Sequence, residues 1–238
     1  MNRYKTFIKN LEKVVSSSGR NLDEIEVIAV SKKKSAENIR EVINQNHRSF
    51  GENQIQEIEK KWPDLRKENK DIKLNFVGSI QSRKVESIFN YCDVIHSIDR
   101  MKIVKMFAEL EMANNQKKEY FIQINTGNEP QKSGVLMSQA EQFISECKSK
   151  YSLNIVGLMC LPPINQDPKD HFMNLKDLAR NFKFSSLSMG MSGDYEAAIE
   201  CGSTHIRIGT HIFGERIQSW TITVLLSFIF WDNFIISS

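Results

Sequence analysis

Eight short apolar runs, separated by longer segments with helical spacing, are the feature of this chain that most restricts its fold. Strands and helices that alternate along a chain pair in parallel, through right-handed crossover connections. Eight such units match a closed (β/α)8 barrel better than an open doubly wound sheet. No linker or shift in composition divides them, which favours one domain. The runs are Glu26–Val30, Ser49–Gly51, Leu74–Val77, Val94–Ser97, Tyr120–Ile124, Ile155–Leu158, Phe184–Met189 and His205–Ile208.

A further amphipathic helix is predicted at the N-terminus, before the first run. Tyr4, Ile8, Leu11 and Val15 recur at helical spacing and lie on one side of it. The segment Met1–Lys13 is polar and basic and lacks the apolar centre of a secretory signal. We therefore expect the chain to stay in the cytoplasm.

Charge and composition exclude several classes of function. The formal net charge is only +3, and lysines stand beside acidic residues along the chain, so nucleic acid is not an expected partner. The four cysteines are far apart and form no C-x-x-C pair, which favours reduced, buried thiols over disulfides or zinc. The five histidines show no H-E-x-x-H pattern, so no metal site is predicted.

Two glycine-containing turns near the end of the barrel sequence are suited to a phosphate. The stretch Ser188–Gly214 holds two apolar runs that each end in small or hydroxyl residues, with the helix-like segment Asp194–Glu200 between them. Backbone N–H groups at a strand-to-helix turn point outward, and the helix dipole adds positive potential. Phosphate sites in eight-stranded α/β barrels often lie after the last two strands. A phosphorylated ligand is therefore predicted.

A run of three lysines follows the first predicted strand. A solvated turn is the ordinary interpretation of such a run. Strand alternation separates its members, because Lys32 continues the face of Ile28 and Val30 whereas Lys33 points the other way. A lysine desolvated at the mouth of a barrel is a nucleophile toward aldehydes. Lys32 and the phosphate turns together predict a phosphorylated aldehyde, of which pyridoxal 5′-phosphate (PLP) is the common example.

Seven motifs occur in order between the first predicted strand and Arg216. They are A-V-S-K at Ala29–Lys32, F-G-E-N-x-x-Q at Phe50–Gln56, F-V-G-x-I-Q-S-x-K at Phe76–Lys84, Q-I-N-T-x-x-E-x-x-K-S-G at Gln123–Gly134, G-L-M-C-L-P-P at Gly157–Pro163, S-M-G-M-S-x-D at Ser188–Asp194 and G-S-T-x-I-R-I-G-T-x-I-F-G at Gly202–Gly214. With these motifs the chain resembles the YggS/PROSC family of pyridoxal phosphate homeostasis proteins. That resemblance implies a TIM barrel like the N-terminal barrel of alanine racemase, over residues 1–216.

The resemblance also implies seven cofactor-binding residues. They are Lys32, holding PLP as a Schiff base; Ser192, Gly209 and Thr210, binding its phosphate; Arg207, facing the pyridine nitrogen; and Asn53 and Met189, near the cofactor. Other interpretations stay open for three kinds of residue. The methionine can be a core side chain, the hydroxyls can cap helices, and the arginine can pair with a buried carboxylate.

Arg207 and the chain length bear on the chemistry of such a site. An arginine stays protonated, so it donates to the pyridine nitrogen and leaves the ring a weaker electron sink. Related racemases carry a further β-rich domain with an acid/base tyrosine, for which the 24 residues after Gly214 leave no room. The resemblance thus implies a protein of intracellular PLP homeostasis without robust catalysis or catalytic residues. A PLP-dependent amino-acid racemase is the alternative, and a phosphosugar enzyme without PLP is a third.

The expected partners are PLP and the PLP-dependent apoenzymes that would receive it. A monomer is expected, because the domain that completes the racemase dimer is lacking. After Arg216 the resemblance stops, and residues 217–238 form an atypical hydrophobic tail. Its apolar part, Trp220–Trp231, is short for a membrane span, which needs about 20 residues. We therefore expect an altered C-terminus in place of the family's last helix, with a membrane anchor as the alternative.

Overall fold

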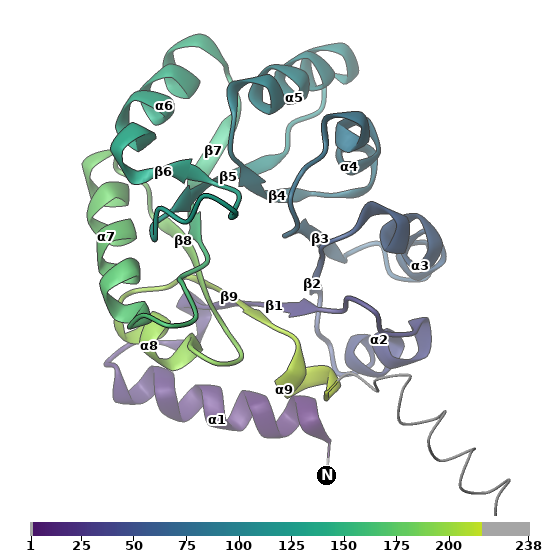
Figure 1. Cartoon of the computed structure of the whole chain (residues 1–238). Coiled ribbons are helices and arrows are strands. Elements are labelled where there is room, and N and C mark those ends of the chain that lie inside the picture. Colours follow the sequence, from purple (N-terminus) through teal and green to yellow (C-terminus); the bar gives the residue numbers. More distant parts are fainter. Residues whose placement is uncertain (1, 216–238) are drawn as a thin grey trace, which may run out of the picture.

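Parallel strands close into a barrel inside a ring of helices (Figure 1). The computed structural model describes residues 2–215. Within this range the strands adjoin in the order β4-β3-β2-β1-β9-β8-β7-β5, and pairing of β4 with β5 closes the ring. The barrel strands are β1 (Glu26–Val30), β2 (Ser49–Glu52), β3 (Lys73–Phe76), β4 (Val94–Ile98), β5 (Glu119–Asn125), β7 (Asn154–Cys160), β8 (Ser186–Met191) and β9 (His205–Ile208). The predicted (β/α)8 barrel is confirmed.

Helices follow the strands and cover the outside of the barrel (Figure 1). They are α2 (Ala36–Ile43), α3 (Ile55–Glu68), α4 (Val85–Tyr91), α5 (Met101–Asn114), α6 (Met137–Lys150), α7 (Pro168–Asn181), α8 (Tyr195–Glu200) and the short α9 (Thr210–Phe213). A two-residue strand, β6 (Val135–Leu136), pairs with the end of β5 and precedes α6. Strand β8 begins later than predicted, because the backbone N–H of Phe184 bonds to Ala179 O at the end of α7.

The predicted N-terminal helix is present as α1 (Arg3–Ser17). Asn2 caps it, since the Asn2 side chain accepts hydrogen bonds from the backbone N–H groups of Tyr4 and Lys5. The helix packs against α8 and α9, on the side of the barrel where the last helix is short. Its buried side chains are Phe7, Leu11 and Val15, which belong to the main core.

Replacing Leu11 with alanine tests the contribution of α1 to the barrel. Leu11 is fully buried, so its removal leaves a cavity beneath α1 and is expected to cost about 2–5 kcal/mol of unfolding free energy. Urea denaturation followed by circular dichroism measures it. Leu22→Ala is the control, because Leu22 is 37% exposed and its loss should cost far less. Equal losses in both variants would mean that α1 adds little to stability.

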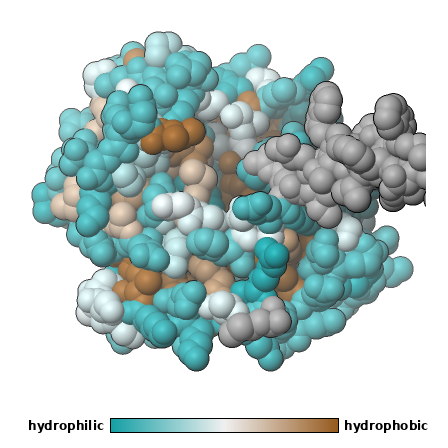
Figure 2. All heavy atoms as spheres, turned by 60° about the horizontal axis from the view of Figure 1, so that its bottom comes forward, coloured by the Kyte–Doolittle hydropathy of each residue, from teal (hydrophilic) through white to brown (hydrophobic). Residues whose placement is uncertain are grey.

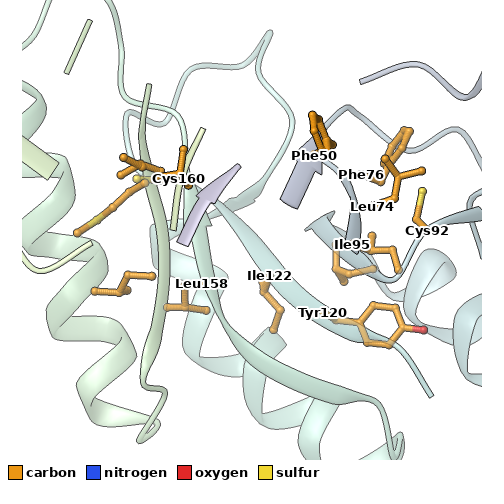
Figure 3. Close-up of a cluster of buried hydrophobic side chains, with 14 of the residues drawn as sticks. Phe50, Leu74, Phe76, Cys92, Ile95, Tyr120, Ile122, Leu158 and Cys160 are labelled. Carbon is orange, nitrogen blue, oxygen red and sulfur yellow. The ribbon is translucent and has the colours of Figure 1, made fainter. Parts of the chain in front are cut away.

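Each barrel strand divides its side chains between two environments. The outward-facing side chains join the helices in one large hydrophobic core (Figure 3). Phe50 of β2, Leu74 of β3 and Ile122 of β5 are examples, and all three are fully buried. The opposite, inward-facing positions hold a small apolar cluster of Val94, Phe121 and Met159. The interior also carries polar side chains, among them Asn75, His96 and Arg207, which separates this barrel from one filled only with branched apolar residues.

The remaining observations on the fold concern the surface, the cysteines, and the searches for membrane-spanning helices and metal sites. Hydrophilic residues dominate the face shown in Figure 2, with apolar residues in separate patches. All four cysteines are free and buried, as predicted. Over residues 2–215, no helix is long and apolar enough to cross a membrane. In the same range, no group of three or more His, Cys, Asp or Glu side chains could hold a metal ion. The predicted hydrophobic tail, residues 217–238, lies outside the described residues.

Candidate functional site

A cavity of about 430 Å³ opens at the carboxyl ends of the barrel strands. This is the end at which (β/α)8 barrels carry their active sites, and the volume is in the range of small-molecule pockets. Six of the seven residues predicted to bind a cofactor line it: Lys32, Asn53, Ser192, Arg207, Gly209 and Thr210. Other parts of the wall come from Val77, Gly78 and Ser79 after β3, and from Leu161 after β7.

Lys32 lies in the loop between β1 and α2, on the wall of the cavity. Among residues 2–215 its ammonium group has neither a hydrogen-bond nor an ion-pair partner. Its two lysine neighbours differ from it. Lys33 is exposed and adopts a left-handed backbone conformation (φ 60°). The Nζ of Lys34 donates hydrogen bonds to Phe213 O and Gly214 O at 3.2 and 3.0 Å. Lys32 and Lys34 both line the cavity, and of these two it is Lys32 whose amine has no partner within the described residues.

A buried ion pair beneath the loop holds the backbone that presents Lys32. Lys61 of α3 lies 2.7 Å from the carboxylate of Glu52, at the end of β2, and both side chains are largely or fully buried. The Nζ of Lys61 also donates to Ser31 O at 3.1 Å. The Ser31 hydroxyl in turn donates to Glu52 at 2.7 Å. Burial raises the pKa of the Glu52 carboxyl, and the Lys61 ammonium opposes that rise.

Glu57 of α3 fixes the next turn of the same loop. Its carboxylate accepts a hydrogen bond from the backbone N–H of Lys33 at 2.6 Å and contacts Lys61 at 2.8 Å. These bonds hold Lys33 in its left-handed backbone conformation, which a lysine adopts only at a cost in conformational energy. Helix α3 and strand β2 thus set the position of Lys32, although neither carries a predicted nucleophile.

The phosphate-type turns follow β8 and β9 and meet at the cavity wall. The Asp194 carboxylate accepts the backbone N–H of Met191 at 2.6 Å and so closes the β8 turn. No hydrogen bond within residues 2–215 uses the backbone N–H groups of Ser192, Gly193 or Thr210. These donors are available to an anion, as expected where strands lead into helices. The side chains of Ser192 and Thr210 add hydroxyl groups to the same wall.

Arg207 places a cation at the inner wall of the cavity. The side chain comes from β9 and is 5% exposed. Its guanidinium donates to the Ser188 hydroxyl at 2.7 Å and to Cys160 O at 2.9 Å. Among the described residues it forms no ion pair with a carboxylate. Burial lowers the pKa of Arg207, but an arginine remains charged in proteins even so.

The structure does not bring Met189 to the cavity. Met189 is fully buried in the main hydrophobic core, on the outer face of β8. Successive side chains of a strand point to opposite faces, so Ser188 and not Met189 faces the barrel interior. Met191, two residues further on, lines the cavity in its place. Strand alternation alone could have indicated the outward position of Met189. It could not have indicated Met191, because the β8–β9 register shifts between Ser188 and Met191.

Several residues that shape the site were missed by the sequence analysis. Glu52 and Lys61 were missed because their pairing joins β2 to α3 through the tertiary structure. Gly78 lets the loop after β3 approach the Asn53 backbone, since a Cβ at this position would overlap with it. His96 and Ser188 share the inward parity of their strands, which is a detectable signal, but nothing local shows that they contact each other.

Comparisons with known proteins agree with this geometry. The family model of the alanine racemase N-terminal domain matches residues 4–217. The pyridoxal phosphate homeostasis protein of Aquifex aeolicus is 32% identical over 223 residues, which cover 90% of this chain and 97% of that protein. Its counterpart in Escherichia coli is 34% identical over 210 residues, covering 84% and 90%.

Solved structures give the same result at the level of the fold. PipY from Synechococcus elongatus, solved with PLP bound, matches with a TM-score of 0.75 at 26% identity and covers 85% of this chain and 99% of its own. An alanine racemase from Clostridium difficile has a TM-score of 0.65 at 10% identity, with 87% and 56% covered, and shares the fold alone. The chain therefore belongs to the alanine racemase N-terminal domain family, and within it to the pyridoxal phosphate homeostasis proteins.

Proposed function

We propose that this chain binds PLP in the cavity at the carboxyl end of the barrel and serves intracellular PLP homeostasis. One observation carries the proposal: a lysine amine and three backbone N–H groups that have no partner within residues 2–215 border one cavity together with a buried guanidinium. An aldehyde, a phosphate and a pyridine nitrogen need these three kinds of group. The relative from Synechococcus, solved with PLP bound, supports the same ligand.

Lys32 would form the covalent link. When bound, PLP supplies an aldehyde that condenses with an amine, forming a carbon–nitrogen double bond and releasing water. The Lys32 amine suits this role because no carboxylate or carbonyl within the described residues occupies it. The contacts of Lys61 and Glu57 with the loop keep the amine directed at the cavity.

The phosphate would occupy the turns after β8 and β9. The backbone N–H groups of Ser192, Gly193 and Thr210 would donate to it, together with the hydroxyls of Ser192 and Thr210. Gly209 adds no side chain to this wall, so the phosphate can approach the backbone. Asn53 would border the ring from the loop after β2.

Arg207 would donate a hydrogen bond to the pyridine nitrogen. Because a guanidinium has no acceptor, that nitrogen would carry no proton, and negative charge that develops on the ring would be poorly stabilised. The cavity lining, as far as residues 2–215 describe it, has no carboxylate, imidazole, phenol or thiol. Racemisation needs a second proton donor across the ligand from the lysine. We therefore propose that the protein holds PLP and is not a robust catalyst.

Holding the aldehyde as an imine would limit its reaction with other amines until it is passed on. The open mouth of the barrel would give PLP-dependent apoenzymes or their substrates access to the ligand. We propose that this cytoplasmic carrier acts as a monomer, which sedimentation equilibrium would test.

Borohydride trapping followed by peptide mass spectrometry tests the assignment. Reduction of the PLP-loaded protein is expected to leave a pyridoxyl group on the peptide that contains Lys32. In Lys32→Ala this adduct should be lost, whereas Lys33→Ala should keep it, because Lys33 is exposed and points away from the cavity. An adduct that persists in Lys32→Ala at the wild-type level would overturn the assignment. Exchange of the Cα proton of alanine in deuterated water, with accumulation of the D-isomer at enzyme-like rates, would favour the racemase.

A further inference from the structure

We propose that Ser188, His96 and Asn75 form a one-directional hydrogen-bond chain that positions Arg207 at the cavity and connects it to the carboxylate of Glu26. Every link lies inside the barrel, on side chains from different strands. This hydrogen-bond chain begins with Arg207 at the cavity and ends with Glu26 at the amino end of β1. The direction of its hydrogen bonds follows from the backbone carbonyl oxygen of Phe50, which can only accept.

The carbonyl oxygen of Phe50 fixes the orientation of the Asn75 amide. Asn75 is fully buried, and its Nδ2 donates to Phe50 O at 3.0 Å and to the Ser49 hydroxyl at 3.1 Å. A flipped amide would place Oδ1 against the Phe50 carbonyl, which can only accept. The Nδ2 group therefore faces Phe50, and Oδ1 faces His96.

The orientation of Asn75 selects the tautomer of His96. The Nε2 of His96 lies 2.9 Å from Asn75 Oδ1, which can only accept, so Nε2 must carry the proton. Burial lowers the pKa of His96 well below its ordinary value, and the charges of His205 and Arg207 lower it further. The ring stacks on Phe121, with centroids 4.4 Å apart, which holds its plane. A neutral imidazole with its proton on Nε2 leaves Nδ1 as an acceptor.

The Ser188 hydroxyl then completes the connection to Arg207. Its oxygen lies 2.9 Å from His96 Nδ1 and 2.7 Å from a guanidinium nitrogen of Arg207. Because Nδ1 accepts, Ser188 gives its single proton to His96. Because arginine only donates, the Ser188 oxygen accepts from Arg207. Each of the three side chains is satisfied in this arrangement and in no other.

The far end of the chain is a carboxylate. The Ser49 hydroxyl accepts from Asn75 and donates to Glu26 at 2.7 Å. Glu26 also lies 3.3 Å from Lys73 and 3.5 Å from His205. Burial alone would raise the pKa of Glu26, but hydrogen bonds from His205 and Ser49 and the charges of His205 and Lys73 bring it below its ordinary value. The chain thus ends on a charged acceptor.

This arrangement serves the cavity in two ways. Hydrogen bonds aligned in one direction polarise one another, so Ser188 is a better acceptor for Arg207 than an isolated hydroxyl. Arg207 also receives this support without an ion pair to any carboxylate of residues 2–215, and its remaining N–H groups stay available to the cavity. Ser188, His96 and Asn75 are therefore positioning residues for Arg207. The use of the remaining Arg207 N–H groups to contact a ligand rests on the proposed function, whereas the polarisation of Ser188 does not.

Long-range ¹H–¹⁵N NMR of the protein without ligand tests the direction of the hydrogen-bond chain through the tautomer of His96. The spectrum distinguishes a protonated ring nitrogen from an unprotonated one, and the loss of one set of signals in His96→Gln assigns His96. In the wild type, His96 is expected to show protonated Nε2 and unprotonated Nδ1 between pH 6 and 8. Asn75→Leu should release the constraint and populate the other tautomer. Ser49→Ala is the matched control, because the Asn75–Phe50 bond that selects the tautomer remains.

PLP release provides the second measurement. Loss of a hydrogen bond to a charged group costs about 1.5–3 kcal/mol, so Ser188→Ala should release PLP at least about tenfold faster than the wild type. Ser203→Ala is the control, since the hydrogen bonds of the buried Ser203 hydroxyl within the described residues all go to backbone oxygens, those of Leu187, Met189 and His205. Tautomer analysis of Ser188→Ala should still show protonated Nε2, because Asn75 is unchanged.

The results separate the two proposals. The proposed hydrogen-bond chain would be refuted if wild-type His96 carries a proton on Nδ1, either as the other tautomer or as an imidazolium. It would also be refuted if the Asn75→Leu spectrum is identical to that of the wild type. If Asn75→Leu does not fold, the wild-type spectrum alone decides the tautomer. Equal PLP release from the Ser188 and Ser203 variants would overturn the positioning of Arg207. A wild-type protein that takes up no PLP would refute the proposed function, while the NMR result would still decide the chain.

Discussion

Replacing Lys61 with methionine is expected to lower the free energy of unfolding by about 3–5 kcal/mol. The substitution removes the cation 2.7 Å from Glu52 and leaves a fully buried carboxyl group without its charge partner. The methionine fills a similar volume, so the loss reports the charge and its hydrogen bonds. The carbonyl of Ser31 also loses one of its two donors and keeps only the backbone N–H of Lys34, which loosens the loop that presents Lys32. Urea denaturation measures the stability, and the rate of PLP uptake measures the state of the loop.

The double variant Glu52→Gln/Lys61→Met is the matched control. A neutral glutamine can still accept from the Ser31 hydroxyl and the Trp62 indole, which now contact Glu52. Removing both charges should therefore recover most of the stability lost in Lys61→Met, since no fully buried charge stays unpaired. The Glu57 carboxylate also loses Lys61, but it is partly exposed and keeps the hydrogen bond from the Lys33 N–H. PLP uptake should remain impaired in the double variant, because Ser31 O still lacks Lys61. If both variants are equally stable, the ion pair is not the source of the effect.

Replacing Gly157 with alanine is expected to destabilise the barrel by about 3 kcal/mol. Gly157 lies in β7, and a Cβ at this position would overlap with the backbone carbonyl of Ser186, its neighbour in β8. Backbone atoms in a paired strand cannot move aside as a flexible side chain can. The β7–β8 pairing must therefore open locally, and this pairing is part of the closed ring. Thermal and urea denaturation, with circular dichroism as the probe, measure the loss.

Gly193→Ala is the control for this substitution. A Cβ on Gly193 would have no heavy atom within 4 Å, so its stability should stay within about 0.5 kcal/mol of the wild type. A wild-type-like Gly157→Ala would mean that β7 and β8 can separate without loss, contrary to the close packing of the two backbones. A large loss in Gly193→Ala would mean that the loop after β8 contributes to stability beyond its own contacts.

The fold could be predicted because its signals repeat locally. Each apolar run and each helical segment is recognisable within a few residues, and parallel pairing with right-handed crossovers leaves few ways to join eight of them. Strand alternation likewise placed Lys32 on the inner face beside Val30, and both line the cavity. The same rule places Met189 on the outer face, where the structure finds it in the core. For this residue, alternation was a better guide than the resemblance.

The sequence by itself determined the barrel, the family, and six residues that come together at one cavity. Only the tertiary structure decided how those residues are supported. His96 and Ser188 are 92 positions apart in the chain, and Glu52 and Lys61 meet because α3 folds back over the end of β2. Such contacts depend on strand register and on closure of the barrel, which no short segment encodes alone. The direction of the chain from Arg207 to Glu26 depends on one backbone carbonyl, that of Phe50, and therefore on the folded barrel as a whole.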